Sequence, residues 1–255
     1  MPFQKIAAEK LSQAAVRQIE QLILQGVLRP GDRLPAERDL AETMGVSRPS
    51  LREALSEMQQ GGLLIARPGS GVYVADVLGS AFSPALVRLI SEHSQAADDY
   101  LAFRRDLEGI AAQRAALVAG DGDLAVIDQG YQRMVEAHKK VSPQQDAELD
   151  AAFHMSIVEA GHNVIALHMM RSMQDLLRQG MLLNRARIFT LPQTRDTLLQ
   201  QHGAINAALQ ARDGDEARRR VETHLDFVAD RLKAQRQSDE HDALARRRLD
   251  RRTTQ

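Results

Sequence analysis

The chain has 255 residues, of which 44% are hydrophobic and 26% charged, and its formal net charge is −1. This composition excludes a disordered chain and a strongly basic protein that binds nucleic acids without sequence specificity. The length suits two domains. Cysteine is absent, which excludes disulfides and thiolate metal sites. No apolar run reaches the roughly 18 residues of a membrane span, and the N-terminus lacks a signal core. We therefore expect a cytoplasmic protein with no membrane partner.

The first expected element is a helix over residues 11–25, which ends at Gly26. A second helix and a tight turn with Gly45 follow, and another helix begins at Ser47. Ser47 is a favourable N-cap, and a proline at position 49 costs little so near a helix start. Apolar residues at i, i+4 and i+7 predict the buried face of this last helix: Leu51, Leu55 and Met58. The side chains left on its outward face are Arg48, Ser50 and Arg52.

Two short strands, 63–66 and 72–74, are expected next, joined by the turn Arg67-Pro68-Gly69-Ser70-Gly71. Helix, turn, helix and hairpin together predict a winged helix-turn-helix domain over residues 1–76. Recognition helices contact bases with their N-terminal turns, so the pattern predicts binding to double-stranded DNA. The alternative is an ordinary helical hairpin whose exposed arginines are only solvated. Residues 1–76 hold nine basic and nine acidic residues, so only a local surface can be basic.

The rest of the chain has helical periodicity. We expect a linker region over 77–97, part loop and part short helix, and then an all-α bundle over 98–236. Breaks at 120–123, 142–143, 161, 190–192 and 213–215 predict about six helices. Residues 237–255 carry Arg246-Arg247-Arg248 and form a basic tail, for which a solvated terminus is favoured over a helix. The expected fold class is mainly α, with a winged helix-turn-helix domain followed by a helical bundle.

One set of polar residues in the bundle has the chemistry of a metal site. Asp150 and His154 are four apart, so they share one helix face, and His202 and His224 lie on two later helices. One carboxylate and three imidazoles would suit Zn²⁺, or else Ni²⁺ or Mn²⁺. By spacing alone, an ordinary surface pair is the more frequent meaning of Asp-x-x-x-His.

Residues 11–74 resemble the DNA-binding domain of the GntR family of bacterial transcription factors. The resemblance rests on PGDRLPAER (30–38), VSRPSLREAL (46–55) and Gly69-Ser70-Gly71. It implies that arginines contact bases and phosphates, serines contact phosphates, and a wing glycine approaches the DNA. On this mapping the DNA-binding residues are Arg38, Ser47, Arg48, Ser50, Arg52 and Gly69.

DAAFH (150–154), GHN (161–163) and two later histidines 22 residues apart resemble the FCD domain, the effector domain of the FadR subfamily. The resemblance implies that Asp150, His154, His202 and His224 bind one divalent metal beneath a cavity for a small carboxylate. It places Arg104 at that cavity, although a salt bridge to Glu108 is an equal alternative. It also places Asn163 near the effector, although Asn163 could instead cap the next helix.

Together these features predict a dimeric repressor of central carbon metabolism genes that reads a palindromic operator and is released by a small carboxylate. Pyruvate is the first expected effector, and L-lactate and glycolate are alternatives. A metalloenzyme is a weaker hypothesis, because no motif places a general base beside the ligands. A DNA-architectural protein without an effector is also a weaker hypothesis. Its helical domain would serve only for dimerisation, which does not require a set of metal-binding side chains inside the bundle.

Overall fold

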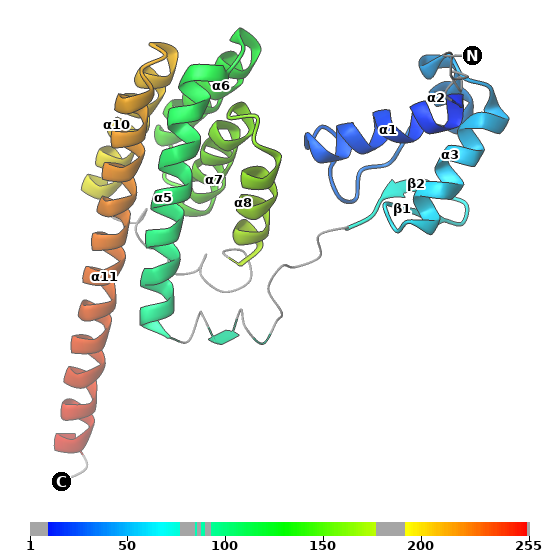
Figure 1. Cartoon of the computed structure of the whole chain (residues 1–255). Helices are drawn as coiled ribbons and strands as arrows, with labels where there is room; N and C mark the ends of the chain where they lie inside the picture. The colour runs from blue at the N-terminus through cyan, green and yellow to red at the C-terminus, as the bar shows by residue number, and fades with distance from the viewer. Residues whose placement is uncertain (1–9, 77–84, 86–87, 90–92, 177–191, 254–255) are drawn as a thin grey trace, which may run out of the picture. The chain divides into compact units, whose positions relative to one another are not determined.

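The computed structural model describes residues 10–76, 85, 88–89, 93–176 and 192–253. The chain divides into two compact units, residues 1–79 and 80–255 (Figure 1). Most of the expected linker, 77–97, lies outside the described residues, and the first helix of the second unit for which the structure gives bounds begins at Ser94. No described helix is long and apolar enough to cross a membrane.

The first unit is the expected winged helix-turn-helix. Its elements are α1 (Leu11–Leu24), α2 (Glu37–Met44), α3 (Arg48–Gln60), β1 (Leu64–Arg67) and β2 (Gly71–Val74). Leu51, Leu55 and Met58 of α3 are buried as predicted, and they pack with Ala15 and Ile19 of α1. The strands pair antiparallel from Leu64↔Val74 to Arg67↔Gly71, within a residue of the predicted hairpin.

Gly45 makes the tight turn between α2 and α3. It ends α2 in the left-handed conformation, with φ 65° and ψ 29°. A side chain at this position would be strained, because residues with a Cβ atom rarely adopt positive φ. The turn sets the direction in which α3 leaves α2, and therefore the surface that α3 presents.

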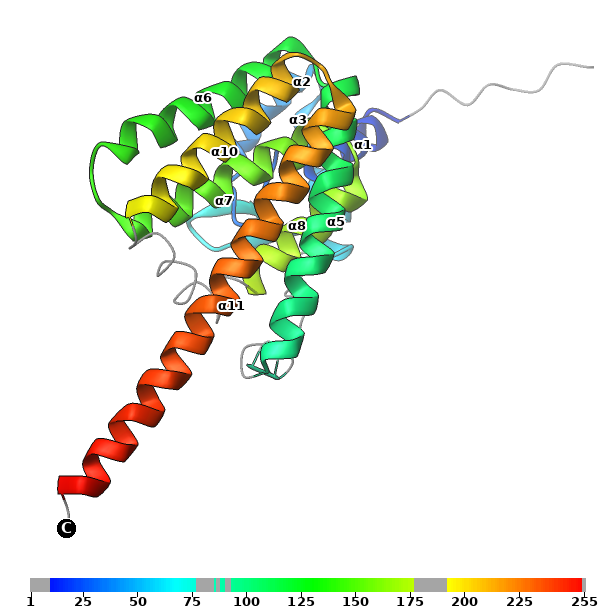
Figure 2. The same ribbon diagram turned by 90° about the vertical axis from the view of Figure 1, so that its left-hand side faces the viewer.

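The second unit is a helical bundle whose described helices break at four of the five predicted places, and residues 190 and 191 of the remaining break lie outside the described residues. The helices are α5 (Ser94–Val118), α6 (Asp121–His138), α7 (Pro143–Ala160), α8 (Val164–Leu176), α10 (Pro192–Gln210) and α11 (Gly214–Thr253). Helix α5 runs beside α11 in both views (Figures 1 and 2). The fold class is therefore the one predicted from the sequence, mainly α with a winged N-terminal domain.

Small residues allow α5 and α11 to approach closely. Ala112 and Ala116 of α5 are fully buried in one core with Val221 and Leu225 of α11. A Cβ atom on Gly109 would lie 3.0 Å from Cγ of Glu222 on α11, so that position has almost no room for a side chain. This close packing fixes the two helices that flank the polar residues of the bundle.

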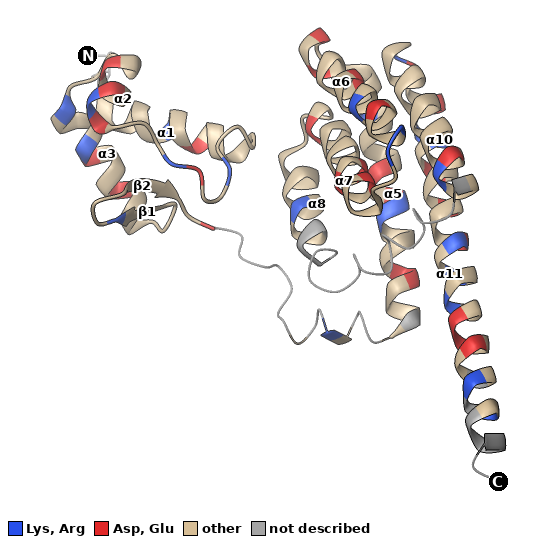
Figure 3. Cartoon of the chain, turned by 180° about the vertical axis from the view of Figure 1, so that it is seen from behind, with Lys and Arg blue, Asp and Glu red and all other residues tan. Residues whose placement is uncertain are grey.

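The basic tail is helical. Helix α11 continues through residues 237–253, so the helical alternative describes these residues, and their described side chains are exposed. This part of α11 extends beyond the other helices of the unit (Figure 2) and carries both acidic and basic residues (Figure 3). It adds little to the core. The candidate metal ligand His224 lies in the N-terminal half of α11.

Candidate metal centre and DNA-binding surface

The first turn of α3 is capped by the side chain of Ser47. Oγ of Ser47 accepts a hydrogen bond from the backbone N–H of Ser50 at 3.2 Å, and the two hydroxyls lie 2.9 Å apart. The predicted N-cap is therefore present. It satisfies a backbone donor that the helix cannot pair itself, and it places Arg48 in the first turn, where a recognition helix meets bases.

The three candidate arginines all lie on the surface of the winged unit. Arg38 pairs with Asp39 at 3.0 Å, Arg52 pairs with Glu37 at 2.8 Å, and Arg48 is exposed. The side chains of Arg38 and Arg52 are 73% and 69% exposed. Such exposed pairs contribute little to stability, so DNA phosphates or bases can replace the carboxylates. The sequence had not indicated Glu37 as the partner of Arg52.

The wing is a tight β-turn between the two strands. Gly69 and Gly71 have φ of 71° and 113°, in the region that favours glycine. A Cβ atom on Gly71 would lie 3.0 Å from Nε of Arg33. Arg67 stacks over the ring of Tyr73, 4.4 Å from its centroid, which supports the base of the wing. Gly69 therefore lies at the tip, where the resemblance placed it.

In the helical unit, three helices bring the four predicted metal ligands together. Asp150 and His154 come from α7, His202 from α10 and His224 from α11. Each residue is at most 1% exposed, and one ligand atom from each lies within 4.8 Å of the others. The alternative of an ordinary surface pair is thus inconsistent with their burial.

The ligand atoms face a common centre. Nε2 of His154 lies 3.3 Å from Nε2 of His202 and 3.3 Å from Nε2 of His224. Oδ1 of Asp150 lies 3.2 Å from Nε2 of His202. Three imidazole nitrogens at such distances cannot all be satisfied by one another, because a neutral imidazole has one donor and one acceptor. A cation bound among them would satisfy every nitrogen lone pair, so the donor set fits a divalent metal.

Groups outside the cluster orient two of the imidazoles. Nδ1 of His154 lies 2.5 Å from Oε2 of Glu108, and Nδ1 of His224 lies 2.9 Å from Oε1 of Gln201. When Nδ1 of His224 carries the proton and donates it to Gln201, Nε2 is left as a lone pair directed inward, the usual arrangement around metal-binding histidines. Nδ1 of His154 lies close to the carboxylate of Glu108 without meeting hydrogen-bond geometry. The sequence had not indicated either role, because Glu108 and Gln201 lie 46 and 23 residues from the histidines they contact.

Burial and the charges around the cluster favour a neutral His224 and an ionised Glu108. Burial, together with His202 and His154, lowers the pKa of His224 well below its usual value. Burial alone would raise the pKa of Glu108, but the nearby Arg104 and His154 outweigh it and hold that pKa at about 2. Metal-binding histidines must be deprotonated at the metal-facing nitrogen, and the lowered pKa of His224 favours that state.

Arg104 is a buried cation next to the cluster. It pairs with Glu108, which in turn contacts His154, so the arginine is linked to a metal ligand through one carboxylate. Burial would lower the pKa of Arg104, but the charge of Glu108 outweighs it and raises that pKa. Nη1 of Arg104 is buried without a hydrogen-bond partner in the described part of the chain. The salt-bridge alternative is therefore present, and one guanidinium nitrogen is still available to a ligand.

Asn163 lies outside this constellation. It is exposed, and its Oδ1 accepts hydrogen bonds from the backbone N–H groups of Ile165 and Ala166, both at 3.1 Å. It therefore caps the start of α8, the alternative weighed for it from the sequence. The structure brings together the four candidate metal ligands and Arg104, but not Asn163.

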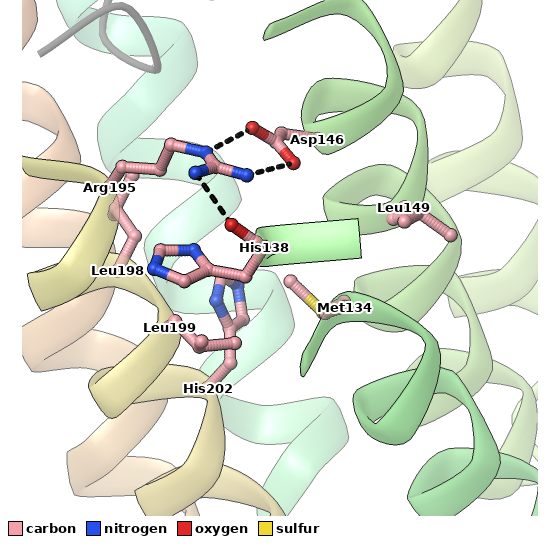
Figure 4. Close-up of a pocket in the computed structure, with 8 residues that line it drawn as sticks. All are labelled: Met134, His138, Asp146, Leu149, Arg195, Leu198, Leu199 and His202. Atoms are coloured by element: carbon pink, nitrogen blue, oxygen red, sulfur yellow. Dashed lines mark hydrogen bonds and ion pairs between the residues drawn. The ribbon is translucent and has the colours of Figure 1, made fainter. Parts of the chain in front are cut away.

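A small cavity adjoins the cluster between α6, α7 and α10 (Figure 4). His202 lines it, as do Arg195 and Asp146, and its volume is about 20 Å³. Arg195 bonds Asp146 and the carbonyl oxygens of residues 137, 138 and 140, so it ties the end of α6 to α7. A space of this size holds about one water molecule, so one metal ligand borders a water-sized space.

Comparisons with known proteins agree with this architecture. Residues 11–74 match the model of bacterial regulatory proteins of the gntR family, and residues 99–227 match that of the FCD domain. A protein named as an L-lactate dehydrogenase operon regulatory protein, from Escherichia coli K12, is 33% identical over 89% of this chain and 88% of its own. The Glc operon transcriptional activator of the same organism is 31% identical over 87% and 89%.

A solved structure, Streptococcus agalactiae GntR, has the same fold with a TM-score of 0.52 and 20% identity. It covers 86% of this chain and 98% of its own. The family and these relatives are transcription regulators and not enzymes, so the metalloenzyme hypothesis is set aside. The chain belongs to the GntR family of bacterial regulatory proteins, as a DNA-binding regulator whose helical unit is an FCD domain.

Proposed function

We propose that the chain is a metabolite-responsive repressor whose helical unit binds one divalent metal ion and a small carboxylate. The observation that carries this proposal is the buried convergence of Asp150, His154, His202 and His224. Zn²⁺ is the first choice, because three imidazoles and one carboxylate suit it best, and Ni²⁺ and Mn²⁺ are alternatives. When bound, the ion would offer coordination positions to the oxygen atoms of an effector.

The residues around the cluster support a carboxylate as the effector. The unpartnered Nη1 of Arg104 can donate a charge-assisted hydrogen bond, which is shorter and stronger than a neutral one. Glu108 holds the other side of the same guanidinium and fixes its orientation. The adjoining cavity holds about one water molecule, so it leaves no room for a long acyl chain beside His202.

A 2-oxo or 2-hydroxy acid fits this site best, because its carboxylate and adjacent oxygen can chelate one ion. Pyruvate is the first candidate, on a resemblance of residues 104–112 (RRDLEGIAA) and 158–177 (VEAGHNVIALHMMRSMQDLL) to the pyruvate dehydrogenase complex repressor. L-lactate is the second candidate, and the name of the Escherichia coli relative supports it. Glycolate, the shortest 2-hydroxy acid, is the third.

DNA binding would use the exposed residues of the winged unit. Arg38, Arg48 and Arg52 would contact base edges and phosphates, since arginine is the most frequent partner of guanine. Ser47 and Ser50 would contact phosphates and Gly69 would approach the DNA at the wing. A homodimer would read a palindromic operator, because the symmetry of the protein is repeated in its site.

The effector would act by shifting the dimer between two geometries. It can do so only to the extent that its affinity differs between them. In the repressor that we propose, the geometry favoured by the effector no longer fits adjacent half-sites, so the operator is released. One relative is named an activator. The test therefore also measures whether the effector weakens or strengthens operator binding.

The test measures operator affinity while pyruvate, L-lactate and glycolate are titrated in turn, with a fatty acyl thioester as the control ligand. The operator is first obtained by in vitro selection. Arg104 is buried and paired, and its loss would leave Glu108 as an unpaired buried charge. Arg104→Lys is therefore the sharper variant, since it keeps the charge and removes the planar fork. It should bind the operator as the parent does but need at least about tenfold more effector, the loss of roughly 1.4 kcal/mol.

Two results would contradict the proposal. One is a parent protein whose operator affinity responds to the thioester and to none of the small acids. The other is an Arg104→Lys protein that responds like the parent. Arg105→Lys is the matched control, because Arg105 is the next residue of α5 and pairs with Asp226 at the surface.

A further inference from the structure

The C-terminal extension of α11, residues 237–253, is exposed on every side chain that the structure describes there. Just before it, Arg236 pairs with Asp98 of α5, and the extension then runs beyond the other helices of the unit (Figure 2). At 1.5 Å per residue it is ~25 Å long. Most helices in proteins are stabilised by packing an apolar face against a core, and such packing does not account for this one.

The extension ends in a basic run. Residues 243–255 hold five arginines and one aspartate, a net side-chain charge of +4. Residues 1–76 hold nine basic and nine acidic residues, and residues 77–230 hold sixteen basic and twenty-one acidic ones. Positive charge is thus concentrated at the C-terminal end of α11, although the whole chain has a net charge of −1.

The arginines of the extension differ from those in the bundle part of the same helix. In the bundle part, three consecutive arginines each pair with a glutamate about one turn away: Arg218, Arg219 and Arg220. In the extension, Arg246 and Arg248 are exposed, and neither forms an ion pair with a residue that the structure describes. Their guanidinium groups, which are always charged, are therefore open to an anionic partner.

The helix dipole does not explain the basic run. Positive side chains are favourable at a helix C-terminus, but the effect falls off within the last turn. The run begins at Arg246, about two turns before α11 ends at Thr253. A block of like charge at a chain terminus is instead typical of a segment that binds nucleic acid.

We propose that the extension binds the phosphates of double-stranded DNA without reading their sequence. The chain belongs to a DNA-binding family, so a chain whose winged unit is on DNA keeps its own extension tethered near that DNA at a high effective concentration. The winged unit is neutral overall and has little net charge with which to attract phosphates. Arginine binds phosphate through its planar fork of N–H donors. This inference depends on neither the metal nor the effector.

Phosphate binding by the extension has a measurable consequence. A protein that neutralises phosphates releases counterions, so the logarithm of its affinity falls with the logarithm of the salt concentration by about 0.9 for each phosphate. Every phosphate contact of the extension should therefore steepen this dependence by about 0.9. The increase should be the same on operator and unrelated DNA, because phosphates carry no sequence information.

The test compares two triple variants of the full-length chain by fluorescence anisotropy between about 50 and 200 mM salt. R246Q/R247Q/R248Q removes three charges from the extension. R218Q/R219Q/R220Q removes three from the bundle part of the same helix, so the two variants have equal net charge. Across this range the parent should lose roughly threefold more affinity than the extension variant for each phosphate contact removed. The bundle variant should follow the parent.

A charge-preserving variant and unrelated DNA sharpen the result. R246K/R247K/R248K should keep the salt dependence of the parent, because lysine also binds phosphate as a point charge. The extension variant should lose affinity by the same factor on operator and unrelated DNA, unlike Arg48→Ala. Because unrelated DNA is measured too, the extension is tested even if the winged unit fails to read the operator. Circular dichroism checks that each variant is folded.

Three results would overturn the inference. The first is an extension variant with the salt dependence of the parent. The second is a bundle variant that loses as much affinity as the extension variant, since net charge alone would then be responsible. The third is a parent that binds vesicles of anionic phospholipid through the extension while its DNA affinity does not depend on it, which would assign the extension to a membrane surface.

Discussion

The two units of this chain carry their candidate sites in opposite ways. In the winged unit the residues expected to contact DNA are exposed, with Arg38 and Arg52 at 73% and 69%. In the helical unit the candidate ligands are at most 1% exposed and belong to the core. The exposed site can change without altering the fold, whereas occupation of the buried site is bound to affect stability. A ligand in the helical unit thus has a physical means of changing the arrangement of α7, α10 and α11.

Metal removal should give the largest effect and should fall on one unit alone. A ligand that binds only the folded state stabilises it by about 4 kcal/mol when its free concentration is a thousand times its dissociation constant. We expect a chelator to lower the melting temperature of the helical unit by several degrees and to leave the winged unit unchanged, as followed by calorimetry.

His202→Asn should remove this response to chelator, whereas His241→Asn, at an exposed position of α11, should retain it. A parent protein that melts identically with and without chelator would contradict this difference between the two units. The four buried polar residues would then contribute only to packing.

Substitution of the recognition arginines should give the next largest effect, on DNA affinity without a loss of stability. Arg48→Ala and Arg52→Ala should each cost about 1–3 kcal/mol and relax sequence preference at the contacted base pair. Fluorescence anisotropy with the selected operator measures both. Arg219→Ala, in the helical unit, is the control and should bind as the parent does. If both recognition-helix variants keep full affinity, the surface assigned to DNA is wrong.

The smallest effects should come from the two helix caps, one in each unit. Ser47→Ala should lower the stability of the winged unit by about 1 kcal/mol, and Asn163→Ala should do the same to the helical unit, because each loses a side-chain acceptor at a helix start. Chemical denaturation followed by circular dichroism resolves the two. Effector affinity should be unchanged in Asn163→Ala, and a marked loss would show instead that Asn163 contacts the ligand.

The winged unit could be predicted almost completely from its sequence, because its signals are local. Ser47, Gly45 and the spacing of Leu51, Leu55 and Met58 act within one or two helical turns, and the wing within one hairpin. Each of these features lies where the sequence placed it. The ion pair between Arg52 and Glu37 was missed, since it joins two helices across the turn.

The helical unit was predictable in its breaks but not in its contacts. Gly161, Pro143 and the Asp213–Asp215 turn end or begin helices by local chemistry. That His154 contacts Glu108, and His224 contacts Gln201, depends on how three helices pack. Spacing alone gave Asp150 and His154 one face and left His202 and His224 as possible partners on later helices, and the family resemblance joined the four into one predicted metal site.

The most direct test of this account is the metal content of the full-length chain, purified without chelator and measured by elemental analysis. The account predicts about one divalent ion per chain, because the four candidate ligands form one cluster, and little or none in His202→Asn or His224→Asn. It predicts that the parent regains the ion on incubation with Zn²⁺ after stripping. A parent chain with no bound metal, before and after incubation with Zn²⁺, Ni²⁺ or Mn²⁺, would contradict it.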